Sequence, residues 1–367
     1  MTRIEVETAS RGYPVVIDEG LVGNAAEPLR PFARNDRLII VSDRNVWALW
    51  GSALSGSLRE GGIAADPIIL APGEESKSWA TLAGLVDALL ERGVERNDAI
   101  VALGGGVVGD LTGFAAAIVK RGCRYVQVPT TLLAQVDSSV GGKTAINTAA
   151  GKNLVGVFHQ PSLVLIDPAV LATLPVRELR AGYAEVVKYG VIGDDGFFGW
   201  CEANGAALIG GDNRLRTAAT AYCVRAKAAV VAIDTHETQG QRALLNFGHT
   251  FGHALEAATG FSERLLHGEA VALGMVLALR FSAGRGLCDR IEADRLAAHL
   301  AATGLPADLR SQGLAVSAEG LVAHMARDKK MRDGRLPFIL ARSIGDAFVD
   351  PDVDLAEIRA FLADELP

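Results

Sequence analysis

The sequence predicts an α/β domain with a mostly parallel sheet over residues 1–175, followed by an all-α domain over residues 176–367. Three observations predict this. The first half alternates short apolar runs with helical stretches, which is typical of parallel sheets covered by helices on both faces. After Leu174 and Pro175 the chain changes to long, alanine-rich amphipathic stretches. A length of 367 residues, 49% of them hydrophobic, fits about two domains.

The individual elements follow from apolar periodicity and from turn residues. In the first domain, strands are expected at 4–7, 15–18, 38–42, 68–70, 99–103, 125–128 and 163–167, with a helix at 78–92. In the second domain, helices are expected at 176–189, 213–234, 249–258, 268–285, 291–303 and 318–328, with a late pair of strands at 337–340 and 346–349. His299 lies in one of these alanine-rich helices and is expected to be exposed.

Composition excludes several classes of protein. With 36 basic and 43 acidic residues the net charge is −7, so no basic excess is present to hold nucleic acid or an anionic membrane. The longest apolar run, 270–279, is too short for a membrane span, and the first residues lack the apolar stretch of a signal peptide. The four cysteines form no CxxC pair, as expected of reduced thiols. We therefore expect a cytoplasmic protein that binds neither nucleic acid nor membrane.

A glycine-rich turn follows the predicted strand 99–103. Gly104, Gly106 and Gly109 fit the pattern G-x-G-x-x-G, which lets a backbone approach a pyrophosphate at a helix N-terminus. The alternative is a tight turn without a ligand. No acidic residue lies between Leu111 and Val136, where a ribose-binding carboxylate normally falls in a Rossmann fold. Asp43 could take that role instead, or could simply cap a helix.

Three histidines fall within 25 residues of one another. His249 and His253 are four residues apart and share a helix face, and His267 follows before a glycine. Thr250 stands where a zincin metalloprotease needs glutamate, so that class is disfavoured. A carboxylate such as Glu185 could complete a metal site with two of the histidines. The alternatives are a structural histidine pair and a surface ion pair between Glu185 and Lys188.

Several cationic residues sit beside glycine, asparagine or apolar neighbours, which are poor settings for solvated charges. They are Lys143, Lys152, Lys188, Lys227 and Arg242, and Arg121 is considered together with them. Each alone is an ordinary partner for a salt bridge. Together they could form a pocket for a polyanion that carries a phosphate and a carboxylate.

Seven segments, taken in order, carry a resemblance to a known family. They are 104–114 GGGVVGDLTGF, 128–133 VPTTLL, 137–147 DSSVGGKTAIN, 151–153 GKN, 185–188 EVVK, 246–254 NFGHTFGHA and 267–269 HGE. Together they resemble the motifs of the 3-dehydroquinate synthases, a family of sugar-phosphate cyclases. The resemblance extends from about residue 43 to residue 330.

The resemblance implies a Rossmann-like, NAD-binding α/β domain, a helical metal- and substrate-binding domain, one divalent ion (zinc or cobalt) and a homodimer. It implies that the metal ligands are Glu185, His249 and His267, which leaves His253 as a polar catalytic neighbour. The implied NAD contacts are Asp43, Pro72, Gly73, Glu74, Glu75, Ser76, Lys77, Gly106, Val107, Val108, Gly109, Asp110, Thr130, Thr131, Val170, Leu171, Ala172 and Thr173. Asp137, Lys143 and Lys152 are implied where cofactor and substrate meet. The implied substrate contacts are Asn153, Lys188, Lys227, Arg242, Asn246 and His253. The substrate phosphate is expected at Arg121, which a neighbouring subunit could contribute, and at Lys329 or Lys330.

The implied reaction converts 3-deoxy-D-arabino-heptulosonate 7-phosphate to 3-dehydroquinate and phosphate. It proceeds through a transient oxidation by NAD, β-elimination of phosphate, re-reduction and an intramolecular aldol closure, with no net redox change. Two other enzyme classes share the fold and the cofactors: cyclases of the 2-deoxy-scyllo-inosose and valiolone types, and polyol dehydrogenases of the glycerol dehydrogenase type. An NAD-responsive binding module is a third alternative, although it would need no metal. Lys227 and Arg242 favour a substrate with a carboxylate.

Overall fold

The computed structural model describes residues 1–8, 12–149, 151–235, 237, 240–326 and 335–366, and it divides into two compact units. Unit 1 comprises Met1–Pro175 and Arg216–His236, and unit 2 comprises Val176–Leu215 and Glu237–Pro367. The first segment of unit 1 ends at Pro175, where the sequence analysis placed the domain boundary. The segment Arg216–His236, assigned by the sequence analysis to the second domain, lies in unit 1 instead.

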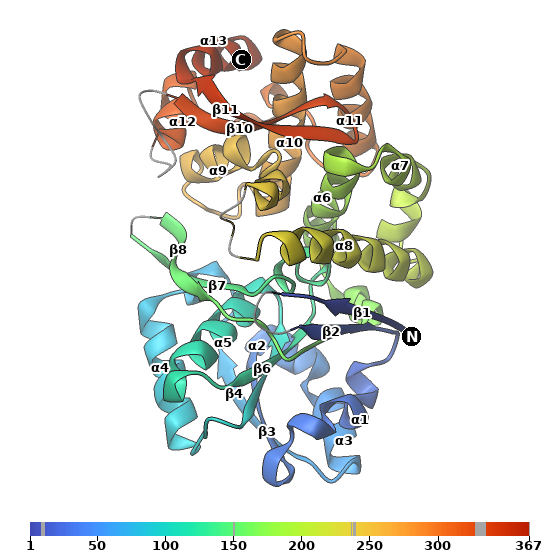
Figure 1. Cartoon of the computed structure of the whole chain (residues 1–367), viewed down its shortest axis with the longest axis vertical. Helices are drawn as coiled ribbons and strands as arrows, with labels where there is room; N and C mark the ends of the chain where they lie inside the picture. The colour runs from blue at the N-terminus through green and yellow to red at the C-terminus, as the bar shows by residue number, and fades with distance from the viewer. Residues whose placement is uncertain (9–11, 150, 236, 238–239, 327–334, 367) are drawn as a thin grey trace. The chain divides into compact units, whose positions relative to one another are not determined.

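Unit 1 contains a seven-stranded sheet in the order β1-β2-β9-β6-β5-β3-β4. Its strands are β1 (Thr2–Val6), β2 (Tyr13–Ile17), β3 (Arg37–Asp43), β4 (Ala64–Leu70), β5 (Ala99–Gly104), β6 (Arg124–Pro129) and β9 (Leu163–Ile166). Figure 1 labels five of these strands, β1, β2, β3, β4 and β6. Only β1 is antiparallel to its neighbour; the other pairs are parallel. All seven correspond to strands expected from the sequence, and the predicted α/β fold class is confirmed.

Both faces of this sheet are covered, which explains why its strands are unbroken apolar runs. Side chains alternate along a strand, so Leu38 and Ile40 face one side and Ile39 and Val41 the other. The first pair lies in a buried cluster with residues of α1 (Ala26–Leu29) and α3 (Ser52–Glu60). The second pair lies in a cluster with residues of α4 (Trp79–Glu91) and α5 (Gly106–Ile118).

The chain reverses its direction of winding between β3 and β5. From β3 it proceeds to β4 at one edge of the sheet, whereas β5, β6 and β9 follow one another on the other side of β3. In such sheets ligands bind beyond the carboxyl ends of the strands at the point of reversal. The segments that follow β3 and β5 are therefore the expected ligand site of unit 1.

Two further elements complete unit 1. A hairpin of β7 (Lys143–Thr148) and β8 (Gly151–Phe158) follows β6, and the sequence analysis did not predict it. Helix α8 (Asn213–Ile233) buries Ala221, Val224, Ala228 and Val231 in a cluster with residues of β1, β2 and β9. These four residues recur at intervals of three or four, so they form one apolar face of the helix.

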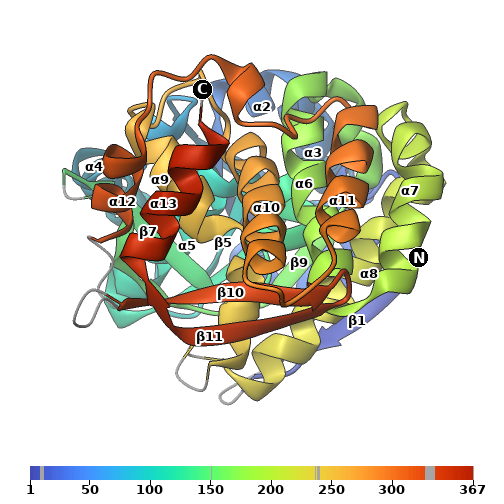
Figure 2. The ribbon, with the colours of Figure 1, turned by 90° about the horizontal axis from the view of Figure 1, so that it is seen from above.

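Unit 2 is mainly helical. Its helices are α6 (Val176–Gly193), α7 (Asp195–Ile209), α9 (His249–Ala258), α10 (His267–Gly284), α11 (Arg290–Ala302), α12 (Ala318–Met325) and α13 (Leu355–Glu365). Figure 2 shows α10 between α11 and α13, near the hairpin of β10 (Arg335–Ser343) and β11 (Asp346–Asp354). The hairpin extends the late pair of strands expected from the sequence, whereas α7 and α13 were not predicted. Among the described residues, no helix is both long enough and apolar enough to cross a membrane.

One expectation about unit 2 is wrong. His299 on α11 is buried, with 7% of its surface exposed, rather than facing solvent. Its Nε2 lies 3.0 Å from the hydroxyl of Tyr183 on α6, and its ring also packs edge-on against Phe198. The many alanines around His299 leave room for neighbouring helices to approach, so they indicate a packed helix rather than an exposed one.

Glycines allow α6, α9 and α10 to approach one another closely. A methyl group at Gly268 of α10 would overlap the carbonyl oxygen of Ala181 of α6, and one at Gly274 would overlap the carbonyl oxygen of Gly248. At Gly252 of α9 it would lie 3.0 Å from the carbonyl oxygen of Ala270. These contacts set the spacing of the three helices that carry Glu185, His249 and His267.

Candidate functional site

The residues expected to hold NAD lie in unit 1, in segments that follow the carboxyl ends of five parallel strands. Asp43 is the last residue of β3, residues 72–77 follow β4, and residues 106–110 open α5 after β5. Thr130 and Thr131 follow β6, and residues 170–173 belong to the 3₁₀ segment Pro168–Thr173 after β9. The fold thus gathers these segments at one edge of the sheet.

The glycine turn connects β5 directly to α5. The helix begins at Gly106 with Gly105 as its N-cap, and no side chain caps it. A methyl group at Gly104 would lie 2.6 Å from Cβ of Val108, and one at Gly109 would lie 2.7 Å from Oε1 of Gln127. Close packing against the β-branched Val108 therefore requires glycine at position 104, whereas the end of the Gln127 side chain could shift to admit a methyl group at position 109. The N–H groups of an uncapped first helical turn fit a pyrophosphate, so the turn is compatible with NAD.

A buried lysine connects two of the expected cofactor segments. Nζ of Lys77 lies 2.6 Å from Oδ2 of Asp110 and also donates to Oδ1 of Asn153. Asn147, which the sequence analysis did not single out, accepts the N–H of Asn153 at 3.0 Å and donates to Oε1 of Glu74 at 2.8 Å. Burial raises the pKa of Asp110, while the charge and hydrogen bond of Lys77 act in the opposite direction. The network holds the segment after β4, the start of α5 and strand β8 together.

Asp43 shows the capping geometry that the sequence left open. Its Oδ1 accepts the N–H groups of Asn45 at 2.8 Å and Val46 at 3.0 Å, which caps α2 (Arg44–Val46). The cap uses one carboxylate oxygen and leaves Oδ2 available for a ribose. Thr173 accepts a hydrogen bond from Nε1 of Trp50 at 3.1 Å and donates to the carbonyl oxygen of Val170.

A second ion pair lies elsewhere in unit 1. Nζ of Lys227 on α8 lies 2.9 Å from Oδ1 of Asp137 and 2.8 Å from its carbonyl oxygen. Lys143 and Lys152 lie on β7 and β8, where Lys143 is exposed and Lys152 is half-buried. Three of the predicted cationic residues of this unit, Lys143, Lys152 and Lys227, therefore lie on the β7–β8 hairpin and on α8.

Unit 2 brings together the acidic and imidazole groups expected to bind metal. Glu185 on α6 is 1% exposed, and its Oε1 lies 3.5 Å from Nε2 of His249 and 3.6 Å from Nε2 of His267. One ligand atom from each residue lies within 4.8 Å of the other two. This spacing and this donor set, one carboxylate and two imidazoles, fit a divalent ion such as zinc or cobalt.

Hydrogen bonds fix which nitrogen of each imidazole faces Glu185. Nδ1 of His249 lies 3.1 Å from the carbonyl oxygen of Phe247, and Nδ1 of His267 lies 3.0 Å from Oε2 of Glu256. Since both partners are acceptors, each Nδ1 carries the hydrogen and each Nε2 can offer a lone pair to a metal. Glu256 was not predicted, although it lies seven residues after His249 and therefore on the same helix face.

The surroundings of the two imidazoles shift their pKa values in opposite directions. Burial lowers the pKa of His249 to about 3, so this ring is neutral at physiological pH. Burial also acts to lower the pKa of His267, but hydrogen bonds to Glu185 and Glu256 outweigh it and raise that pKa to about 10. Without a metal ion, protonated His267 is thus a positive charge beside Glu185.

The other predicted residues of unit 2 lie as follows. Lys188 is fully buried and its Nζ pairs with Oε2 of Glu185. The exposed His253 places its ring 5.3 Å from that of His249, between centroids. Arg242 is buried in the 3₁₀ segment Gln241–Asn246, whose last residue, Asn246, donates to Oε1 of Glu237 at 3.2 Å. Lys329 and Lys330 lie outside the described residues.

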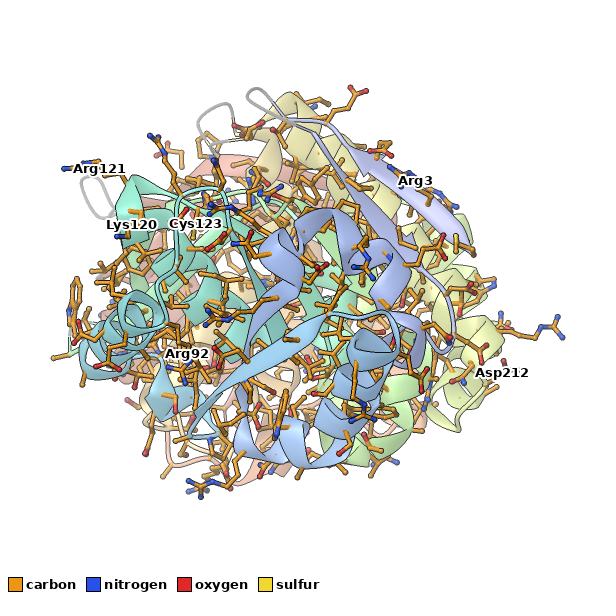
Figure 3. The ribbon with its side chains drawn as sticks, turned by 90° about the horizontal axis from the view of Figure 1, so that it is seen from below. Arg3, Arg92, Lys120, Arg121, Cys123 and Asp212 are labelled. Atoms are coloured by element: carbon orange, nitrogen blue, oxygen red, sulfur yellow. The ribbon has the colours of Figure 1, made fainter. Side chains whose placement is uncertain are left out.

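Arg121 lies at an exposed corner of unit 1. Figure 3 shows its side chain projecting outward from the ribbon. Lys120, Arg121 and Gly122 have φ values of 51°, 63° and 111°, so three consecutive residues adopt the left-handed region. Such a run is unfavourable for residues other than glycine, and it makes a sharp corner that exposes Arg121.

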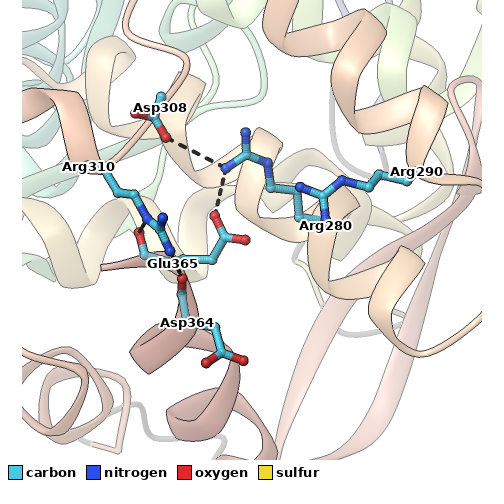
Figure 4. Close-up of a pocket in the computed structure, with 6 residues that line it drawn as sticks. All are labelled: Arg280, Arg290, Asp308, Arg310, Asp364 and Glu365. Carbon is cyan, nitrogen blue, oxygen red and sulfur yellow. Dashed lines mark hydrogen bonds and ion pairs between the residues drawn. The ribbon is translucent and has the colours of Figure 1, made fainter. Parts of the chain in front are cut away.

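A pocket of about 370 Å³ lies in another part of unit 2 (Figure 4). Its lining residues are Arg280, Arg290, Asp308, Arg310, Asp364 and Glu365. Arg280 pairs with Glu365 at 2.6 Å, and Arg310 donates to the carbonyl oxygen of Asp364. Its basic and acidic groups are equal in number, and none of them belongs to the predicted sites. We therefore do not assign the function to this pocket.

Comparison with known families confirms the resemblance inferred from the motifs. Residues 67–181 match the 3-dehydroquinate synthase N-terminal family, and residues 182–331 match the 3-dehydroquinate synthase C-terminal family. A curated 3-dehydroquinate synthase from Zymomonas mobilis is 56% identical over 98% of this chain and 95% of its own length. Another from Caulobacter vibrioides is 55% identical over 99% of this chain and 98% of its own length.

Solved structures support the same relationship. A 2-epi-5-epi-valiolone synthase from Streptomyces hygroscopicus, with NAD⁺ and Zn²⁺ bound, has a TM-score of 0.89 and 33% identity, covering 98% of both chains. A 2-deoxy-scyllo-inosose synthase complexed with carbaglucose-6-phosphate, NAD⁺ and Co²⁺ has a TM-score of 0.89 and 26% identity over the whole of both chains. A glycerol dehydrogenase from Schizosaccharomyces pombe shares the fold alone, at 17% identity and a TM-score of 0.66. On these matches, this chain belongs to the 3-dehydroquinate synthase family.

Proposed function

We propose that this protein is a carbon–oxygen lyase that converts 3-deoxy-D-arabino-heptulosonate 7-phosphate to 3-dehydroquinate and phosphate. The observation that carries the proposal is the cluster of Glu185, His249 and His267 in a chain of this family, with both imidazole Nε2 atoms directed at the carboxylate. Curated 3-dehydroquinate synthases are 54–56% identical to this chain, whereas the valiolone and inosose cyclases are 33% and 26% identical.

We assign NAD to unit 1 and one divalent metal ion to unit 2. Asp43, the 72–77 segment, the glycine turn and the 170–173 segment hold NAD, and Glu185, His249 and His267 hold the metal. When bound, NAD supplies a reversible hydride acceptor and the metal supplies a Lewis acid for an alcohol oxygen. The structures of the two related cyclases were obtained with NAD⁺ and with Zn²⁺ or Co²⁺, which supports this assignment.

The remaining polar residues then have roles in binding and proton transfer. The substrate contacts are assigned to Asn153, Lys188, Lys227, Arg242, Asn246 and His253. Arg242 and Lys227 provide charges suited to the carboxylate that distinguishes this substrate from a hexose phosphate, which has no carboxylate. His253 is exposed and close to the metal cluster, so its imidazole can exchange a proton with the substrate.

We further propose that the protein acts in the cytoplasm as a homodimer in which Arg121 binds the phosphate of substrate held by the other subunit. The side chain of Arg121 is exposed and projects outward from its corner of unit 1, where a second subunit could meet it (Figure 3). If it acts in trans, mixing inactive R121A and E185A proteins will restore part of the activity, because one of the two sites in a mixed dimer is complete. If it acts within its own chain, the mixture will stay inactive.

The reaction assay distinguishes the enzyme classes. Purified protein with NAD, a divalent metal and the heptulosonate phosphate should release one phosphate per substrate consumed, without steady accumulation of NADH. Steady accumulation of NADH would contradict the cyclase reaction and favour a polyol dehydrogenase. Turnover of glucose 6-phosphate in preference to the heptulosonate phosphate would favour an inosose-type cyclase.

A further inference from the structure

Glu256 is a buried carboxylate behind the metal cluster to which neither the motifs nor the comparisons assign a role. It lies on α9, is 2% exposed, and faces the start of α10. Its Oε2 is 3.0 Å from Nδ1 of His267. A buried carboxylate is costly unless it is hydrogen-bonded to a suitable partner, and His267 is such a partner.

The two histidines of the cluster are held in different ways. Nδ1 of His249 donates to a backbone carbonyl oxygen, that of Phe247, at 3.1 Å. Nδ1 of His267 donates instead to a side chain. No substitution removes the carbonyl oxygen of Phe247, whereas a substitution of Glu256 removes the acceptor for His267. The tautomer of His267 is therefore under the control of one residue.

The tautomer matters because the other nitrogen faces the cluster. Nε2 of His267 lies 3.6 Å from Oε1 of Glu185, and its ring centroid lies 5.4 Å from that of His249. If the hydrogen moved from Nδ1 to Nε2, the lone pair needed by a metal would point away from Glu185. A carboxylate that accepts the Nδ1 hydrogen also makes the imidazole a more basic ligand.

We propose that Glu256 is a positioning residue, which fixes His267 in the tautomer and orientation that direct Nε2 toward Glu185 and His249. The inference rests on the proposed metal site. The alternative is that Glu256 is itself a ligand, because His253, Glu256 and His267 also place ligand atoms within 4.8 Å of one another. In that arrangement His267 would have to bind through Nδ1, the nitrogen that now donates to Glu256.

Metal affinity of the purified, metal-free protein tests the proposal without relying on turnover. Co²⁺ or Zn²⁺ is titrated against a chelator of known affinity for wild type, Glu256→Ala and Glu256→Gln, and the visible spectrum of the cobalt form is recorded. The matched control is Glu263→Gln, which removes one charge from an exposed position four residues before His267. Circular dichroism of each metal-free variant shows whether it is folded.

For a positioning role, Glu256→Ala binds metal about 10–100-fold more weakly, the magnitude typical of such carboxylates. Glu256→Gln, whose amide oxygen can still accept the Nδ1 hydrogen, recovers most of the affinity, and the cobalt spectrum keeps its wild-type shape. Affinity equal to wild type in both variants, or a cobalt spectrum that changes in Glu256→Gln as if a ligand were lost, overturns the proposal.

The same titration separates this proposal from the metal site on which it rests. Glu185→Gln should abolish binding at this site. If wild type takes up no metal, or if Glu185→Gln binds like wild type, the proposed metal site is wrong. If Glu185→Gln abolishes binding while Glu256→Ala leaves it unchanged, only the role of Glu256 is wrong.

Discussion

The glycine turn of unit 1 offers backbone groups to a ligand, whereas the histidine cluster of unit 2 offers side chains. The turn between β5 and α5 offers backbone N–H groups, and the contact with Val108 requires glycine at position 104. The cluster offers side chains from three helices, buried and held by further hydrogen bonds. A backbone site depends on local conformation, whereas a side-chain site depends on how distant segments pack.

The largest effect is expected from substitution of Glu185 in the side-chain site. Glu185→Ala should lose the metal and lower kcat by more than about 100-fold, since even a carboxylate behind a metal-bound histidine is typically worth 10–100-fold. NAD affinity depends on residues of unit 1, so it should change by no more than a factor of about two, which corresponds to less than about 0.5 kcal/mol. Metal content, phosphate release and NAD titration measure these quantities. A variant that kept both its metal and its turnover would contradict the assignment.

Proton release provides the next test, because the pKa values of the two histidines differ. In the metal-free protein His267 has a pKa raised to about 10 and His249 one lowered to about 3. At pH 7.5 a metal must displace the proton of His267 but none from His249. Affinity should therefore rise about tenfold per pH unit from roughly pH 7 to 9, with one proton released per ion. Calorimetric titration in buffers of different ionisation enthalpy measures the number of protons released when the metal binds. A value of zero would contradict the predicted release from His267.

The raised pKa of His267 also predicts how the free energy of unfolding of the metal-free protein depends on pH. Since the folded-state pKa of His267 lies above its ordinary value, this group stabilises the fold fully below about pH 6.5. That contribution is lost as pH rises through about 10. Urea denaturation of metal-free wild type and of His267→Gln should show a difference in pH dependence of this sign. Equal pH dependence would contradict the shift.

The stability of the glycine turn should depend on the volume of the side chains in it rather than on their charge. A methyl group in Gly104→Ala would lie 2.6 Å from both Cβ and Cγ2 of Val108, a β-branched side chain that cannot move away, so we expect a loss of about 1–3 kcal/mol in the free energy of unfolding. Gly84→Ala on α4 is the matched control. Its methyl group would meet no atom within 4 Å, and it should stabilise the helix by about 0.5–1 kcal/mol. Equal effects in urea denaturation would contradict the packing argument.

The smallest expected effect separates the two roles of Asp43. Asn caps helices as well as Asp, so Asp43→Asn should change the free energy of unfolding by less than about 0.5 kcal/mol. Loss of the charge should weaken NAD binding about five- to tenfold, the difference between a charged and a neutral acceptor. If NAD affinity were unchanged, Asp43 would be a helix cap only.

Much of unit 1 could be predicted because its signals are local. Each strand of the large sheet is a short apolar run, and the glycine turn follows the strand that precedes it directly. The β7–β8 hairpin was missed because β8 is largely exposed and therefore shows no pattern of burial. Helix α7 was missed because its glycines and aromatic residues interrupt the amphipathic pattern.

The side-chain site was harder to predict, for a physical reason. Spacing identified His249 and His253 as a pair on one helix face. Contacts between helices also bring Oε1 of Glu185 to 3.5 Å from Nε2 of His249, and the ring of His267 to 5.4 Å from the ring of His249. Only the family resemblance selected Glu185, His249 and His267 as ligands. Glu256 could have been found from its seven-residue spacing after His249. That spacing gives the helix face but not the contact with His267.

The central claim is that Glu185, His249 and His267 bind one ion, and a crystal structure of the zinc-loaded protein with anomalous diffraction at the zinc edge tests it most directly. We expect a single ion about 2.0–2.2 Å from Nε2 of both histidines and from one oxygen of Glu185. An ion bound instead by His253, Glu256 and Nδ1 of His267 would contradict the account.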